Sequence, residues 1–139
     1  MINIVFDTNV LVASLLKQNG VNQQCLLSVF SNLDIFNVCF SSQIMDEYED
    51  VLSRPIIRQA DLSNEAKRLL DVFRDFGYEI VPKFLPAIVY PDIKDRPFLE
   101  ACVYVDGVLI TNNLKDFPFV GVNILAPEEF LEWKDTQPF

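Results

Sequence analysis

The chain alternates between short apolar runs and longer stretches in which apolar residues recur every three or four positions. The short runs have the length and the β-branched or aromatic content of buried strands. Strands are expected at residues 2–6, 35–40, 78–81, 108–110 and 122–125. Because helical patterns separate most of these runs, right-handed crossovers and a largely parallel sheet are expected. The pattern therefore predicts an α/β protein, a three-layer α/β/α sandwich with a mainly parallel central sheet of about five strands.

The helical stretches carry their own start and stop signals. Ser41 and Ser42 are N-cap candidates for the helix that follows them. The most regular amphipathic pattern runs through residues 66–76, and Gly77 follows it as a stop signal. Further helices are expected at 10–16, 25–30, 44–52, 98–105 and 128–134. A loop containing Pro82, Pro86 and Pro91 precedes the helix at 98–105.

Length and cysteine content limit the class of protein. With 139 residues, 50% of them hydrophobic, the chain is expected to form one domain over 1–139. Its 3 cysteines lack any CxxC spacing, which is typical of buried thiols in a reducing cytosol. The amino-terminal run lacks a basic signal-peptide region, and no apolar run approaches the roughly 18 residues of a membrane span. We therefore expect a cytoplasmic protein with no membrane contact.

Charge and the absence of histidine narrow the chemistry. The 11 basic and 20 acidic residues give a net charge of −9, which argues against nucleic-acid binding through a broad basic surface. A polyanionic substrate would need metal cations to approach such a protein. Because the chain contains 0 histidines, Ser-His-Asp and Cys-His catalysis and imidazole zinc sites are excluded. Any catalysis must therefore use carboxylates.

Polar side chains follow several of the expected strands. Asp7 follows the first strand, Asn113 follows the fourth, Asp95 opens a helix, and an acid-rich helix at 46–50 follows the second strand. If the sheet is parallel, these groups can gather at its carboxyl edge, where ligands bind in such folds. Closely spaced carboxylates without histidine or cysteine suit Mg²⁺ or Mn²⁺. Such metals polarise phosphates and generate hydroxide from bound water.

Each of these acids also has a purely structural interpretation. Asp7 after a strand and Asp95 just before a proline occupy positions at which side chains commonly cap helices. Asp116, in Lys-Asp-Phe-Pro, is also typical of a turn. In the acid-rich helix, Glu47 and Glu49 flank the apolar stripe on opposite sides, and the helical wheel does not choose between them.

Five blocks along the chain resemble, in order, the successive blocks of PIN-domain proteins. They are VFDTNVLVASLL (5–16), SSQIMDEYEDVLSRP (41–55), DIKDRPFLEAC (92–102), VLITNNLKDFP (108–118) and ILAPEEFLEW (124–133). The likeness is to the branch described as toxin components of bacterial toxin–antitoxin systems, relatives of the VapC toxins. A lone Asp-Thr-Asn after a strand would be weakly specific, whereas five ordered blocks cover nearly the whole chain.

The resemblance implies a Mg²⁺- or Mn²⁺-dependent endoribonuclease with an acidic pocket at the carboxyl edge of the sheet. Asp7, Glu47 and Asp95 match the family's metal-binding and catalytic acids, and this match selects Glu47 from the two acids that flank the stripe. Asn9 and Thr111 match polar residues that orient the first aspartate or bound water.

At the fourth position of the family's site, the chain departs from the common pattern. Many relatives read Thr-Gly-Asp or Thr-Gly-Asn, whereas this chain reads Thr-Asn-Asn at 111–113. Losing a carboxylate weakens a two-metal site more than a one-metal site, because each formal charge helps to hold the cation. Asn113 or Asp116 would complete the site, with Asp116 ranked as a metal ligand below the first three acids.

Two cationic side chains are candidates for substrate binding. Arg96 stands beside Asp95, where relatives often carry Asn or Asp, and Lys115 lies in the turn after the fourth strand. Two roles for Arg96 remain open, contact with a substrate phosphate and partial neutralisation of the neighbouring acid.

The leading hypothesis is metal-dependent hydrolysis of RNA by the toxin of a toxin–antitoxin pair. By the resemblance, its partners are an RNA substrate, a cognate antitoxin and a second copy of the chain in a homodimer. The alternative is a catalytically weak PIN-like module that binds RNA or protein, which the Thr-Asn-Asn departure and the net charge motivate. A phosphotransfer enzyme of the haloacid-dehalogenase type is disfavoured, because it needs a second aspartate at the position of Asn9.

Overall fold

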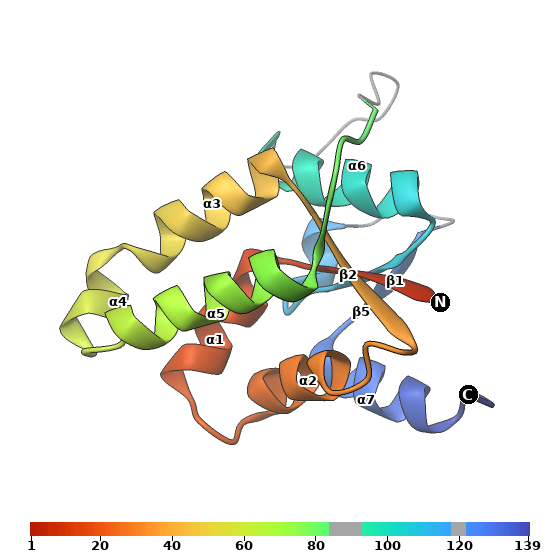
Figure 1. The fold of residues 1–139 in the computed structure, drawn as a ribbon, viewed down its shortest axis with the longest axis horizontal. Coiled ribbons are helices and arrows are strands. Elements are labelled where there is room, and N and C mark those ends of the chain that lie inside the picture. Colours follow the sequence, from red (N-terminus) through yellow and green to blue (C-terminus); the bar gives the residue numbers. More distant parts are fainter. Residues whose placement is uncertain (84–92, 118–121) are drawn as a thin grey trace.

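A five-stranded sheet forms the centre of the molecule, in the order β3-β2-β1-β4-β5 (Figure 1). The computed structural model describes residues 1–83, 93–117 and 122–139, with the backbone but not the side chain of Asp116. The strands are β1 (Ile2–Phe6), β2 (Phe36–Ser41), β3 (Tyr78–Ile80), β4 (Val108–Ile110) and β5 (Asn123–Leu125). Every neighbouring pair of strands is parallel, as the alternating pattern predicted.

Strand β1 occupies the middle of the sheet, and its last three residues are apolar on both faces. Ile4, Val5 and Phe6 are fully buried, which is the pattern of a strand covered on both sides. The register pairs Phe6 with Ile110 of β4, and the Asp7 N–H continues the ladder to the Ile110 carbonyl at 2.9 Å. The residues that follow β1 and β4 therefore leave the sheet side by side.

Helices pack on both faces of this sheet (Figure 1). They are α1 (Thr8–Leu16), α2 (Val21–Phe30), α3 (Ser42–Leu52), α4 (Pro55–Gln59), α5 (Ser63–Phe76), α6 (Arg96–Val105) and α7 (Pro127–Asp135). Helix α6 contacts β1, β2 and β4, while α2 contacts β2 and packs between α1 and α7. This arrangement is the expected three-layer α/β/α sandwich.

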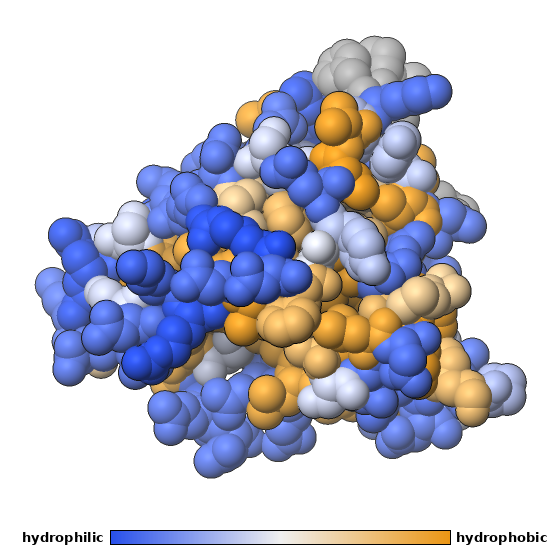
Figure 2. All heavy atoms as spheres, viewed as in Figure 1, coloured by the Kyte–Doolittle hydropathy of each residue, from blue (hydrophilic) through white to orange (hydrophobic). Residues whose placement is uncertain are grey.

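Aromatic side chains fill the space between the sheet and the helices. The ring of Phe73 on α5 makes edge contacts with Phe6 at 5.9 Å and with Tyr48 at 5.3 Å between ring centroids. Such edge-to-face pairs add to the stabilisation that comes from burial alone. In Figure 2, hydrophilic side chains cover the region of α4 and α5, and hydrophobic ones gather between α5 and α2. Within the described residues, no helix combines the length and the apolar character needed to cross a membrane.

Most element boundaries agree with the predicted ones to within a few residues. Ser41 caps α3, and Gly77 ends α5. Helix α4 and two 3-10 turns, η1 (Ile93–Asp95) and η2 (Leu114–Asp116), were not predicted, because segments of three to five residues are too short to show a helical period. Of the expected proline loop, Pro86 and Pro91 lie outside the described residues.

Candidate active site at the carboxyl edge of the sheet

Asp7 is held at this edge by three hydrogen bonds. It is the N-cap of α1, and its Oδ1 accepts a hydrogen bond from the Thr8 N–H at 2.8 Å, as the capping interpretation predicted. Its Oδ2 accepts from the Thr111 hydroxyl at 2.7 Å and from the Asn9 amide at 3.1 Å. The side chain is only 8% exposed. Because donors from β4's end and from α1 converge on it, the carboxylate is fixed in one orientation.

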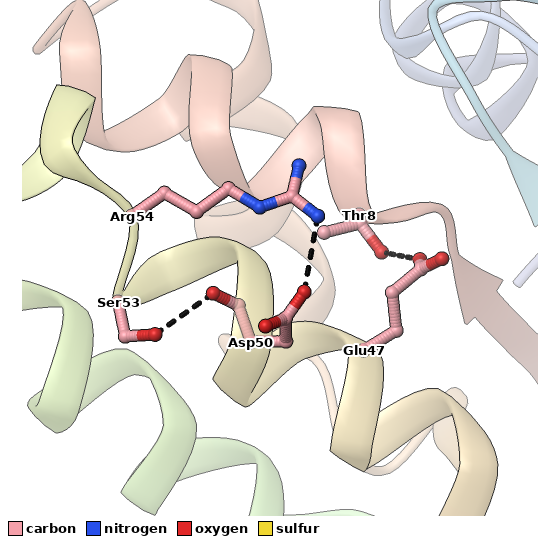
Figure 3. A network of polar contacts seen from close by, with 5 residues as sticks. All are labelled: Thr8, Glu47, Asp50, Ser53 and Arg54. Atoms are coloured by element: carbon pink, nitrogen blue, oxygen red, sulfur yellow. Dashed lines mark hydrogen bonds and ion pairs between the residues drawn. The ribbon is translucent and has the colours of Figure 1, made fainter.

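Thr8 connects Glu47 to Asp7, because it donates a hydrogen bond to each side chain. The Thr8 hydroxyl donates to Glu47 Oε2 (Figure 3), while the Thr8 backbone N–H donates to Asp7. Glu49, on the other side of α3, instead forms an ion pair with Arg74 of α5. The structure thus orients Glu47 toward the first aspartate and Glu49 away from it, which the helical wheel could not decide.

The negative charges of Asp7 and Glu47 both act on the buried phenol of Tyr48. Its hydroxyl donates to the Phe6 carbonyl, the last residue of β1. Burial raises the pKa of Tyr48 well above its ordinary value, and the charges of Asp7 and Glu47 raise it further. Both carboxylates therefore act on the same buried group, next to the point where β1 ends.

Asp95 and Arg96 open α6 at the same edge of the sheet. Asp95 occupies the N-cap position but makes no capping hydrogen bond, in contrast to the structural interpretation. Arg96 forms an ion pair with Glu100 one turn later, with 3.0 Å between Nε and Oε1, and the Glu100 side chain is 6% exposed. Sequence reasoning missed Glu100, although an Arg and a Glu four residues apart on a helix are a recognisable pairing signal.

Of the remaining predicted site residues, the structure describes the side chains of Asn113 and Lys115 but not that of Asp116. The Asn113 backbone N–H donates to the Thr111 hydroxyl oxygen at 3.0 Å, while the Asn113 and Lys115 side chains are exposed. The side chain of Asp116 lies outside what the structure describes. Among described side chains, no group of three or more Asp, Glu, His or Cys residues stands ready to share a metal ion. The structure therefore connects Asp7 with Glu47 through Thr8, and Asp95 opens α6 at the same edge of the sheet.

The donor set at this edge consists of oxygen atoms. The Asp7 and Glu47 carboxylates offer hard oxygen ligands, and the chain has no histidine. Two carboxylates that share one hydroxyl-bearing neighbour repel each other, and a divalent cation relieves that repulsion. The residues present thus fit Mg²⁺ or Mn²⁺ and do not resemble a zinc site.

Comparisons with known proteins agree with this fold. Residues 3–115 match the PIN domain family. None of the curated proteins compared with the chain matches it. Among solved structures, VapBC2 of Rickettsia felis bound to a promoter DNA fragment is 16% identical, with a TM-score of 0.59 over 88% of this chain and 97% of that chain.

Two further solved structures share the fold. VapBC-1 of nontypeable Haemophilus influenzae is 12% identical, with a TM-score of 0.60 over 92% of this chain and 99% of that one. DNA-bound VapBC of Salmonella typhimurium is 14% identical, with a TM-score of 0.57 over 90% and 97% of the two chains. At such identities the structures support the architecture alone, whereas the sequence match spans most of the chain. The protein is therefore a member of the PIN-domain family.

Proposed function

We propose that this protein is a Mg²⁺- or Mn²⁺-dependent endoribonuclease. The observation that carries the proposal is the pair of carboxylates, Asp7 and Glu47, that Thr8 holds together at the carboxyl edge of a PIN-domain sheet. Ligands of parallel α/β sheets bind at this edge. With no histidine in the chain, carboxylates and a metal ion are the remaining means of hydrolysing a phosphodiester.

Asp7 and Glu47 would hold the metal ion, directly or through water, and Asp95 would join them from the start of α6. When bound, the ion would polarise the phosphate and activate a water for in-line attack. Thr111 and Asn9 keep the Asp7 carboxylate oriented through their hydrogen bonds to its Oδ2. We propose Asn113 or Asp116 as the fourth position of the site.

Substrate approach is the step in which the overall charge matters. The net charge of −9 repels a phosphate backbone, so the bound cation would also contribute to RNA binding. Lys115 is exposed and can contact a phosphate. Arg96 is held by the Glu100 carboxylate, and this pairing reduces the net positive charge that it offers to a substrate.

The proposal is tested by RNA cleavage with purified protein. Wild type should cleave RNA in millimolar Mg²⁺ or Mn²⁺ and stop on addition of EDTA. Asp7→Asn and Glu47→Gln should each lower the rate at least about 100-fold, because each removes a formal charge that would hold the cation beside the reacting phosphate. Glu49→Gln is the matched control, since Glu49 pairs with Arg74 on the other side of the same helix. An Asp7→Asn variant with undiminished metal-dependent activity would refute the assignment.

We further propose that the protein is the toxin of a toxin–antitoxin pair. The solved structures with the same fold are named as VapBC complexes, two of them bound to DNA. By analogy, a small antitoxin would cover the acidic edge, and the toxin would be a cytoplasmic homodimer. Induced expression should arrest bacterial growth, and Asp7→Asn should abolish the arrest. Growth arrest that persists with Asp7→Asn would contradict a nuclease toxin.

A catalytically weak binding module is the second candidate. The neutral Asn112 and Asn113 at the fourth position favour it, because they supply no carboxylate there. Calorimetric titration with MgCl₂ separates the two functions. Absence of binding at millimolar Mg²⁺ would favour the module, and binding that Asp7→Asn abolishes would favour the nuclease.

A further inference from the structure

We propose that Asn112 and Asn22 are positioning residues that orient Asn9 and, through it, the Asp7 carboxylate. This inference rests on the proposed function. The Asn112 backbone N–H donates to Asn9 Oδ1 at 3.1 Å, and Asn112 Nδ2 donates to Asn22 Oδ1 at 2.8 Å. Asn22 lies in the first turn of α2, 90 residues away in sequence. A row of three amides thus connects α2 to the candidate active site.

The direction of each hydrogen bond follows from the chemistry of the amide. The Asn9 oxygen accepts from Asn112, so the Asn9 Nδ2 group is turned toward the carboxylate. That nitrogen lies 3.1 Å from Asp7 Oδ2 and 3.4 Å from Thr111 Oγ1. Without the Asn112 contact, the amide could rotate by half a turn and place its oxygen against Asp7, where two acceptors would repel.

At the end of the hydrogen-bond network next to Asp7, the Thr111 hydroxyl has a partner for its proton and a donor to its oxygen. A hydroxyl has one proton, and the Thr111 hydroxyl donates it to Asp7 Oδ2 at 2.7 Å while accepting from the Asn113 N–H at 3.0 Å. The donors of Asn9 and Thr111 therefore converge on one oxygen of Asp7. The row of amides therefore keeps the Asp7 carboxylate in one orientation.

The proposed role of Asn112 depends on its side-chain amide, which bonds Asn22. Its backbone N–H contact to Asn9 would survive in any residue except proline. The longer contact from its Nδ2 to Asn9 Oδ1, at 3.5 Å, and the bond to α2 both need the side-chain amide. Asn112 is exposed, so its loop has little packing of its own, and the bond to half-buried Asn22 fixes the loop against the helix. We infer that loss of this bond lets residues 111–113 move and loosens the orientation of Asn9.

The test uses Asn112→Ala and Asn22→Ala in the full chain, with Mn²⁺ titrated by calorimetry and RNA cleavage as a second readout. Outer positioning residues of metal sites typically contribute 10- to 100-fold, so the Mn²⁺ dissociation constant should rise about 10-fold, and kcat should fall with little change in KM. Asn22→Asp keeps an acceptor oxygen for Asn112 and should restore most of the affinity. Gln24→Ala is the matched control, since the Gln24 amide donates to the Asn19 carbonyl.

A readout independent of activity distinguishes this inference from the proposed function. The side-chain amide resonances of Asn9, observed by NMR without metal, should shift in Asn22→Ala and stay in place in Gln24→Ala. If wild type neither binds Mn²⁺ nor cleaves RNA, the proposed function fails. The Asn9 resonances still show whether the row of amides orients Asn9. If the Asn9 amide resonances do not shift in Asn22→Ala, Asn22 and Asn112 do not orient Asn9, even if wild type is an active nuclease.

Discussion

Asp7 combines a structural role and a proposed chemical role in the same atoms. Its Oδ1 caps α1 through the Thr8 N–H, and its Oδ2 accepts from Thr111 and Asn9. A capping carboxylate is already partly desolvated and fixed, so little further ordering is needed when a cation binds. The capping and metal-binding interpretations therefore do not compete at this residue.

Tyr48 gives a residue-scale prediction about stability. Its hydroxyl donates to the Phe6 carbonyl, and the ring is fully buried. Tyr48→Phe should lower the free energy of unfolding by about 1–3 kcal/mol, because a buried carbonyl loses a donor. Urea denaturation at pH 7.5 measures the effect, and Tyr104→Phe, at a residue that is 51% exposed, is the control. Equal stability of Tyr48→Phe and wild type would contradict the buried hydrogen bond.

Individual residues also mark the limit of prediction from sequence. The chain order shows which acids follow strands, so Asp7 was a candidate from its position, and the resemblance to PIN-domain proteins separated it from a plain helix cap. The choice between Glu47 and Glu49 depends on where α1 and α5 pack against α3, which is tertiary information. The contacts of Asn22 and Asn112 were beyond reach for the same reason, since 90 residues separate them.

At the scale of elements, the sequence predicts long segments better than short ones. The long periodic segments were predictable, because apolar spacing defines them over several turns. Helix α4 has five residues and a proline at its first turn, which a sequence pattern cannot distinguish from a loop. Register, in contrast, depends on the pairing of whole strands, and it places Asp7 and Thr111 next to each other.

Gly107, between α6 and β4, provides a prediction about one such connection. A Cβ at this position would lie 2.6 Å from the Asn3 carbonyl oxygen of β1, a backbone atom that cannot easily move. Gly107→Ala should therefore destabilise the protein by about 1–3 kcal/mol, as overpacking does. Thermal unfolding followed by circular dichroism is the measurement. Gly20→Ser is the control, because serine is favoured at the N-cap of α2. A Gly107→Ala variant as stable as wild type would show that β1 and this connection can separate.

At the scale of the whole molecule, the three layers each contain one free, buried thiol. Cys25 lies on α2, Cys39 on β2 and Cys102 on α6, and the expectation of buried thiols is confirmed. Burial raises the pKa of Cys25 from 9.0 to about 12, that of Cys39 to about 11 and that of Cys102 to about 12. The charge of Glu128 adds a smaller rise at Cys25, and a backbone hydrogen bond with Gly107 lowers the pKa of Cys102.

These thiols predict a loss of stability in alkali. Above pH 9 a thiol ionises in the unfolded chain, while the buried thiol stays protonated, so the unfolded state binds fewer protons and stability falls as the pH rises. The slope approaches about 1.4 kcal/mol per pH unit for each fully buried thiol and vanishes below pH 8. Urea unfolding in reducing buffer at pH 7.5 and 10.5 measures this fall for wild type and Cys25→Ala. The variant should lose less stability between the two pH values, whereas equal losses would show that the Cys25 thiol ionises as readily in the folded protein.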